Sequence, residues 1–227
     1  MQVLSRASLP LGGFAGLTEH RFVMDKRVFG HRKAPMTFDG IGNFVYLADA
    51  QFNPKGETHM HPHREIDVIS IMMDGRISHE GSLEHGQSLH AGEAQVQRAG
   101  GEGFSHNEVN PDNQKNRMLQ LWVLPDEAGQ RAGYKHYTIK ENGVTRIYGG
   151  DKLQTEYFDS ATTIDIVRLN TGESISFEEE FLAYISKGGA EFSDPSNVFT
   201  AMEGDLLRAY QTKITASDDT EIVVIRQ

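Results

Sequence analysis

The chain has 227 residues, a formal net charge of -10 and no cysteine, so disulfides, thiolate nucleophiles and thiolate metal sites are all excluded. The negative charge argues against direct binding to nucleic acid, because the phosphate backbone is recognised by a cationic face. No apolar run approaches the roughly 20 residues that span a membrane. The N-terminus also lacks the basic and then apolar plan of a signal peptide. We therefore expect a cytoplasmic protein that does not bind membranes.

Short apolar or alternating segments recur along the chain, separated by turn residues, and they predict β-strands. In chain order these segments are residues 44–47, 68–73, 118–123, 164–167, 181–185 and 222–225. The pairs Asp74-Gly75 and Gly188-Gly189 have the composition of tight hairpin turns. No long stretch has the period of a helix. The chain is therefore predicted to be all-β, of the barrel or sandwich class.

The order of these elements repeats in the two halves of the chain, which predicts two domains. Residues 55–57 (KGE) and 171–173 (TGE) each precede a strand that ends at one of the two glycine turns. We expect the domains to be residues 1–130 and 131–227, with the glycine-rich, polar segment 125–150 as the connection. Histidines at strand spacing occur in the first copy of the repeat only, so we expect a metal in the N-terminal domain and none in the C-terminal one.

Histidines and a glutamate fall at strand spacing in two segments of the first half. One residue separates His61 from His63, and one separates His106 from Glu108, so the members of each pair share a face of a strand. Brought together, three imidazoles and one carboxylate would bind a divalent metal and leave coordination positions open for a substrate. A lone histidine is more often solvated or packed in a core, but two such pairs in one strand-rich domain favour a metal site.

Other polar residues near these pairs are weaker candidates. His59 is two residues from His61 and would share its face of a regular strand. Pro62, however, interrupts a regular strand and places this segment at a sheet edge or a bulge. Glu65 and Asp67 are either partners that orient an imidazole or solvated residues. The remaining histidines are expected to be solvated or packed, and they are His20, His31, His79, His85, His90 and His136.

The same residues resemble the two motifs of the cupin superfamily. The first motif, with two histidines between glycines, is matched by Gly56, His61, His63, Asp67 and Gly75, with aspartate where the motif has glutamate. The second motif is matched by Gly92, Gly103, His106 and Asn110, with His90 where the motif has proline.

The chain is still more similar to the pirin family of cupins. Residues 61–68 (HPHREIDV), 79–82 (HEGS) and 99–108 (AGGEGFSHNE) resemble pirin segments, and the similarity extends over about residues 40 to 125. The resemblance implies two antiparallel cupin β-barrels, a bicupin, with one metal in the N-terminal barrel. It implies one divalent transition metal, iron ahead of copper, nickel, cobalt, manganese or zinc. The residues that match the family's ligands are His61, His63, His106 and Glu108.

The resemblance leaves three functions open. Pirin-like proteins include quercetin 2,3-dioxygenases, which implies a flavonol and dioxygen as substrates, with Glu108 as the base that takes the proton of the 3-hydroxyl. Other pirins are transcriptional co-regulators, which implies a metal- or redox-sensing module that binds a protein partner. A cupin isomerase or an inactive storage bicupin is the third alternative. A deep apolar pocket that reaches the metal would favour an enzyme, and a blocked site would favour the module.

Overall fold

The computed structural model describes residues 1–84 and 86–227, so the expectation for His85 lies outside the described residues. Strands make up most of the described chain, and its helical elements are short: η1 (Arg6–Ser8), α1 (Lys26–Phe29) and η2 (Gly30–Arg32). All six segments that the sequence predicts to be strands lie in strands, which confirms the all-β class. No helix of the described residues is long and apolar enough to cross a membrane.

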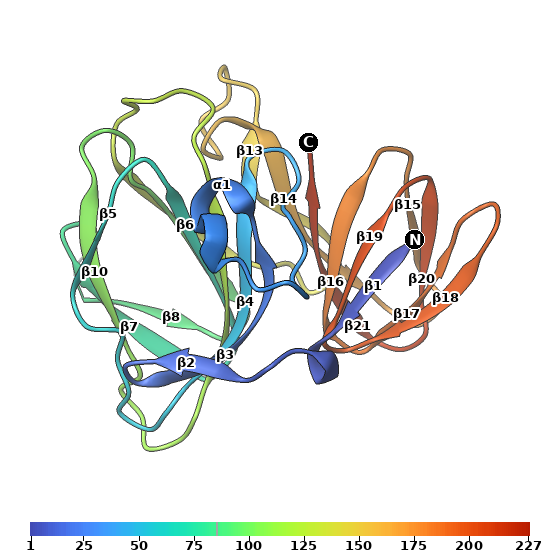
Figure 1. The fold of residues 1–227 in the computed structure, drawn as a ribbon, viewed down its shortest axis with the longest axis horizontal. Coiled ribbons are helices and arrows are strands. Elements are labelled where there is room, and N and C mark those ends of the chain that lie inside the picture. Colours follow the sequence, from blue (N-terminus) through green and yellow to red (C-terminus); the bar gives the residue numbers. More distant parts are fainter. Residues whose placement is uncertain (85) are drawn as a thin grey trace. The chain divides into compact units, whose positions relative to one another are not determined.

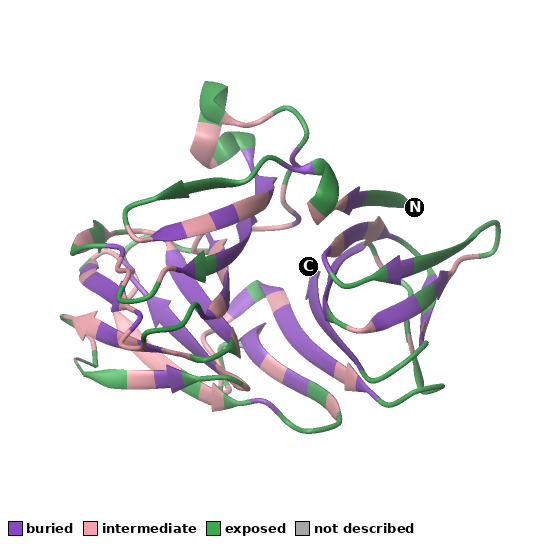
Figure 2. Ribbon diagram, turned by 90° about the horizontal axis from the view of Figure 1, so that it is seen from below, coloured by how far each residue is buried: buried purple, intermediate pink, exposed green. Residues whose placement is uncertain are grey.

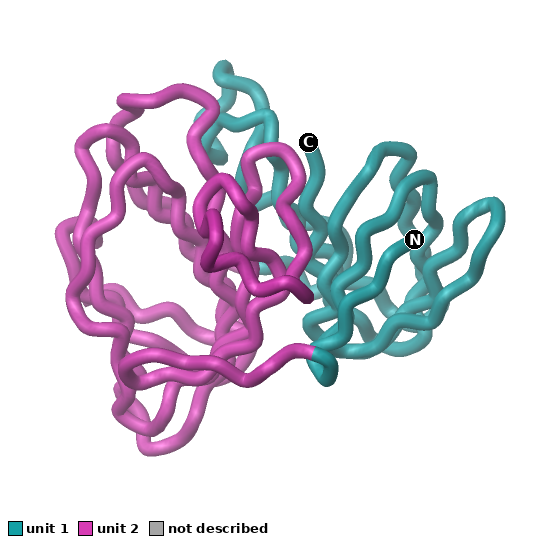
Figure 3. Tube along the Cα trace, in the orientation of Figure 1, with its two compact units in different colours: residues 1–8, 139–227 teal, residues 9–138 magenta. Residues whose placement is uncertain are grey.

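The chain folds into two compact units, coloured separately in Figure 3. The N-terminal unit is residues 9–138, and the C-terminal unit is residues 1–8 and 139–227. These limits differ from the predicted ones for two reasons. Strand β1 (Gln2–Ser5) pairs with β19 (Asp205–Ala209), and β12 (Gly133–Thr138) pairs with β9 (Glu93–Arg98). The segment 125–150, predicted as a connection, therefore holds β12 and all of β13 (Gly143–Gly150), a strand of the C-terminal unit.

The N-terminal unit contains two antiparallel sheets (Figure 1). The larger sheet has the order β12-β9-β6-β11-β4-β3-β2, in which the new strands are β6 (Asp67–Asp74), β11 (Arg117–Val123), β4 (Phe44–Phe52), β3 (Leu17–Met24) and β2 (Gly12–Phe14). The smaller sheet has the order β5-β10-β7-β8, formed by β5 (His61–His63), β10 (Phe104–Val109), β7 (Arg76–Gly81) and β8 (Gln87–His90).

The C-terminal unit repeats this plan. Its larger sheet has the order β1-β19-β16-β21-β14-β13, with β16 (Phe181–Lys187), β21 (Thr220–Arg226) and β14 (Ser160–Leu169). Its smaller sheet has the order β15-β20-β17-β18, formed by β15 (Ser174–Phe177), β20 (Thr212–Ala216), β17 (Gly189–Ser193) and β18 (Val198–Met202). Each strand takes the place of the strand numbered ten lower in the other unit, and β1 takes the place of β12. The predicted repeat is therefore confirmed.

The two glycine turns that the sequence suggests as hairpins are corners instead, so that prediction is wrong. Gly75 (φ 71°) joins β6 to β7, and Gly188 (φ 76°) joins β16 to β17. In each case the two flanking strands belong to different sheets of the same unit. A positive φ explains the sharp turn, but it does not decide whether the next strand pairs with the previous one or crosses to the opposite sheet.

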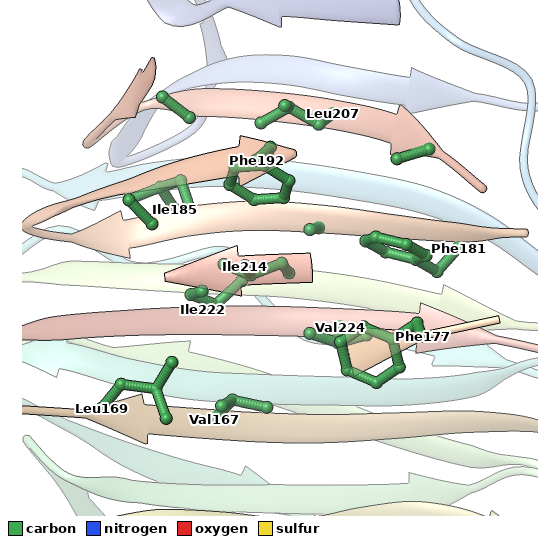
Figure 4. Close-up of a cluster of buried hydrophobic side chains, with 14 of the residues drawn as sticks. Val167, Leu169, Phe177, Phe181, Ile185, Phe192, Leu207, Ile214, Ile222 and Val224 are labelled. Carbon is green, nitrogen blue, oxygen red and sulfur yellow. The ribbon is translucent and has the colours of Figure 1, made fainter. Parts of the chain in front are cut away.

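Buried residues concentrate on the strands, and exposed residues on the loops and strand ends (Figure 2). In the C-terminal unit the side chains between the two sheets form one apolar cluster, which includes Phe177, Phe192 and Ile214 (Figure 4). In the N-terminal unit, apolar clusters share the interior with buried polar residues, among them Ser70, His79, Gln95, His106 and Glu108. The polar part of that interior is the candidate site.

Candidate metal centre

Two neighbouring strands position the histidines of the site. Strand β5 lies at the edge of its sheet beside β10, as Pro62 predicts, and the two strands are antiparallel (Figure 1). His61 is directly opposite His106 in this ladder, and His63 is opposite Phe104. Because directly opposite residues project from the same face, the imidazoles of His61, His63 and His106 converge. Gly103, with φ 75°, forms the bend that precedes β10.

The three imidazoles meet through their Nε2 atoms. The Nε2 of His106 lies 3.1 Å from that of His61 and 3.2 Å from that of His63. Two ring nitrogens bound at about 2.1 Å to one ion and at right angles to each other are about 3.0 Å apart. With all three Nε2 atoms unprotonated, their lone pairs would repel one another without a shared cation. The spacing and the donor type therefore fit a divalent transition metal.

The tautomer of His61 is fixed by the backbone of His59. The Nδ1 of His61 lies 2.7 Å from the His59 carbonyl oxygen, and since a carbonyl only accepts, Nδ1 must carry the proton. The Nε2 lone pair of His61 is then free to face the other two imidazoles, which is the usual arrangement of a histidine ligand. His59 adopts φ 65°, and its side chain is 70% exposed. His59 thus contributes its carbonyl, and the side chain lies in solvent.

Burial keeps the imidazoles of His63 and His106 neutral. Desolvation, followed by the charge of His61, lowers the pKa of His63 to about 4. Desolvation, followed by the charges of His63, His61 and His79, lowers the pKa of His106 to about 2. A histidine must be unprotonated to bind a metal, so both rings are ready to act as ligands at neutral pH.

Glu108 lies on the strand that carries His106, and it is buried in the wall of a cavity that the three histidines also line. Its Oε1 accepts hydrogen bonds from the Ser70 hydroxyl at 2.7 Å and from the Gln95 amide at 3.4 Å. Burial raises its pKa to about 7, against the opposite effect of these two hydrogen bonds. Among the described residues, the close group of donor atoms, all within 4.8 Å of one another, consists of the three histidines. The carboxylate is therefore held beside this group by Ser70 and Gln95.

The other acidic candidates have partners elsewhere. Asp67 is fully buried and its Oδ2 accepts from the Arg98 guanidinium at 3.1 Å. Glu65 accepts from the backbone N–H of Gly129 at 2.9 Å. Asp67 therefore neutralises a buried arginine, and Glu65 fastens a loop.

A polar layer that the sequence does not predict extends from the site, and it includes His79, which is packed in the interior. His79 is fully buried opposite Glu108 in the ladder, and its ring centroid is 5.4 Å from that of His106. Its Nε2 lies 2.8 Å from the amide nitrogen of Gln97. Tyr134 donates to Gln95 at 3.2 Å. The available signal was the alternation of Gln95 and Gln97 within an otherwise apolar strand, because buried glutamines need a polar interior.

A cavity of about 40 Å³ lies against the imidazoles, and we call it the inner cavity. Its lining includes the aromatic rings of Phe14, Tyr46 and Trp122 as well as the three histidines and Glu108. A single water requires roughly 10–15 Å³ on this scale, so the inner cavity has room for a few small molecules.

The segment that carries this site matches a known family. Residues 23–123 match the pirin family model. The resemblance to pirins is thereby confirmed over a segment that contains His61, His63, His106 and Glu108.

Individual relatives extend the similarity beyond this segment. A protein of Zymomonas mobilis named "Putative quercetin 2,3-dioxygenase" is 28% identical over 180 residues, which are 73% of this chain and 74% of the relative. The "Quercetin 2,3-dioxygenase" of Escherichia coli K12 is 30% identical over 76 residues, about a third of each chain. Among solved structures, the E. coli bacterial pirin YhhW in complex with nickel(II) superposes with a TM-score of 0.83 at 18% identity, covering 99% of this chain and 97% of YhhW. The fold is therefore that of YhhW.

Proposed function

We propose that this protein is a metal-dependent dioxygenase that acts on a flavonol such as quercetin and on dioxygen. The Nε2 of His106 lies 3.1 Å from that of His61 and 3.2 Å from that of His63, and this convergence carries the proposal. The names of the relatives from Zymomonas mobilis and E. coli support the choice of substrate.

In this proposal His61, His63 and His106 hold one divalent ion, with Glu108 as the fourth ligand or a neighbour of the ion, and iron is the favoured metal. The ion supplies Lewis acidity that lowers the pKa of the substrate's hydroxyl, together with the one-electron chemistry that dioxygen requires. The His59 carbonyl keeps the His61 ring in the tautomer that leaves its Nε2 unprotonated.

Glu108 takes the proton of the substrate's 3-hydroxyl. A base works best when its pKa is close to the working pH, and burial raises the pKa of Glu108 to about 7. Ser70 and Gln95 hold Oε1 of this carboxylate and so fix its orientation toward the cavity that it lines. The rings of Tyr46 and Trp122, with centroids 4.4 Å apart, offer an aromatic wall that would orient a flat substrate and exclude water.

The direct test is to load the purified protein with iron or nickel and follow the absorbance of quercetin in air and under nitrogen, with carbon monoxide measured in parallel. We expect oxygen-dependent loss of quercetin and release of carbon monoxide well above the rate with free metal. The Glu108→Gln variant should retain metal and lose most of the turnover. Quercetin loss that equals the free-metal rate would contradict the proposal.

One observation favours a second candidate, a metal- or redox-sensing module that binds a protein partner. The inner cavity, at about 40 Å³, is far smaller than the roughly 300 Å³ or more of most organic-ligand sites, as expected if only small molecules reach the metal. Hydrogen–deuterium exchange on ferrous- and ferric-loaded protein tests this candidate. A change of protection on exposed strands, without quercetin turnover, would favour the module, and identical exchange would exclude it.

A further inference from the structure

A second cavity lies in the N-terminal unit, and we call it the outer cavity. Its volume is about 360 Å³, which is within the range of small-molecule sites. Most of its wall is apolar and comes from Leu9, Pro10, Met24, Ala34, Pro35 and Met36. The outer cavity is therefore about nine times larger than the inner one and has the volume of a site for a ring compound.

Glu19 lines both cavities and therefore lies between them. Its side chain is 3% exposed, and its carboxylate accepts from the Arg21 guanidinium at 2.6 Å and from the Tyr46 hydroxyl at 2.9 Å. The two linings are also connected through an apolar cluster. Met24 of the outer cavity belongs to the same cluster as Tyr46 and Trp122 of the inner cavity. A ligand in the outer cavity would thus lie against the residues that border the metal site.

The charges on the outer cavity leave one positive group available. Arg21 is paired with the buried carboxylate of Glu19, so the two charges compensate. Arg32 is exposed at the cavity rim, and among the described residues it has no ion pair. An apolar wall with one available guanidinium is complementary to a ring system that carries one negative charge.

We propose that the outer cavity binds an aromatic anion, with its rings against the apolar wall and its anionic group at Arg32. Glu19, held by Arg21 and Tyr46, then lies between the bound molecule and the inner cavity. A flavonol ionised at one hydroxyl belongs to this class of ligand. This inference rests on the proposed function in one respect, because it takes the bound molecule to be the substrate. Binding itself needs no metal.

Trp122 provides a reporter because it is the sole tryptophan and packs in the cluster that contains Met24 and Ala34. We would titrate 2-naphthoate into metal-free protein, follow Trp122 fluorescence, and measure affinity by calorimetry. Saturable binding with one site and a change of Trp122 emission is expected. If no binding is seen, the proposal is wrong.

Gly12 offers a way to fill the outer cavity. It lines the cavity directly opposite Glu19 in the β2–β3 ladder, so a side chain at this position would lie on the face of Glu19. A Cβ at Gly12 would meet only the Glu19 carbonyl oxygen, at an ordinary 3.7 Å, so substitution is sterically tolerated. Gly12→Phe should weaken 2-naphthoate binding at least tenfold, whereas Gly12→Ala should weaken it less than threefold. Equal affinity of the Phe variant and the parent would overturn the assignment.

The charge of Arg32 is tested separately. Arg32→Gln should weaken 2-naphthoate binding by about two- to fivefold, the usual range for an exposed ion pair. The neutral analogue 2-naphthalenemethanol should bind the variant and the parent equally. Arg131→Gln is the matched control, because Arg131 is also exposed in the N-terminal unit and lines neither cavity. Equal loss in both arginine variants, or equal loss for both ligands, would contradict the role of Arg32.

Failure of this inference and failure of the proposed function give different results. Metal content of Gly12→Phe, measured by elemental analysis, should match that of the parent protein. If 2-naphthoate does not bind but metal-loaded protein degrades quercetin, only the outer-cavity assignment is wrong. If 2-naphthoate binds as expected but quercetin is not degraded, the dioxygenase proposal is wrong and the binding site stands.

Discussion

The strands of the two units have the same order, but the interior of the N-terminal unit is partly polar and that of the C-terminal unit is apolar. Gly75 and Gly188 occupy equivalent corners, so positions counted from them can be compared between the two units. His79 follows Gly75 by four residues, and Phe192 follows Gly188 by four. The residue opposite His79 on the next strand is Glu108, and the residue opposite Phe192 is Ile214. The same scaffold therefore places a histidine and a carboxylate in one interior and two apolar side chains in the other.

The match continues along the same strands. Two residues before Glu108 and Ile214 are His106 and Thr212, which lie opposite His61 and Phe177 respectively. Phe177, Phe192 and Ile214 belong to one apolar cluster, drawn in Figure 4. All ten histidines of the sequence lie before residue 139, so the C-terminal unit contains none. Because folding this scaffold does not need buried histidines, those of the N-terminal unit call for another explanation, and metal binding is the one we propose.

The first prediction concerns the stability of the apolar interior. Phe192→Ala should lower the free energy of unfolding by about 3–5 kcal/mol, since it removes a fully buried ring from the C-terminal cluster. Phe199→Ala, in the neighbouring strand β18 and 36% exposed, is the matched control and should cost under about 1 kcal/mol. Denaturant unfolding measures both. Similar losses in the two variants would refute the contrast between the interiors.

The second prediction concerns the histidines. His106→Ala and His61→Ala should each weaken metal binding by at least about 100-fold, because even partners of ligands are worth 10–100-fold. His90→Ala is the control, since the His90 side chain is 56% exposed and outside the site. Chelator competition followed by elemental analysis gives the affinities. Retained stoichiometry in the two site variants would contradict the ligand assignment.

The third prediction is the pH dependence of the metal-free protein. His63 and His106 have pKa values lowered to about 4 and about 2, so the unfolded chain binds more protons below about pH 6.5 and stability falls on acidification. Glu108, with its pKa raised to about 7, acts in the opposite direction between about pH 7 and 4.5. The net effect from these three groups is about 1.4 kcal/mol lost per pH unit between about pH 6 and 4.5.

Glu108→Gln sharpens this test, because it removes the opposing carboxylate and keeps an oxygen that can accept from Ser70. The variant should therefore lose stability more steeply over the same pH interval, in melting curves recorded with chelator. A shallower slope in the variant would mean that His63 and His106 are not the groups whose lowered pKa values destabilise the protein in acid.

The smallest expected effect is at His59. His59→Asn should change metal affinity by less than about threefold, since the backbone carbonyl that accepts from His61 remains and asparagine tolerates the left-handed conformation. His59→Gly, which also keeps the carbonyl but frees the backbone, should weaken binding more than Asn does. Loss of metal in His59→Asn comparable with that in His61→Ala would show that the side chain, and not the carbonyl, participates.

Part of this molecule could be predicted from the sequence. The strands were predictable because their apolar runs are bounded by turn residues, and the convergence of His61 with His106 followed from strand parity and the family resemblance. The carbonyl of His59 was not predictable, because it depends on a left-handed backbone conformation that histidine seldom adopts. The corners at Gly75 and Gly188 could not be predicted, because turn composition alone does not determine which sheet the next strand joins. The pairing of β1 with β19 joins segments about 200 residues apart, and no local pattern indicates it.

The measurement closest to the central claim is an anomalous-scattering map from a crystal of the protein loaded with iron or nickel. We predict one strong peak about 2.1 Å from the Nε2 atoms of His61, His63 and His106, with none inside the C-terminal unit. A peak on surface carboxylates only, or imidazoles that turn away from a common centre when metal is present, would contradict the account.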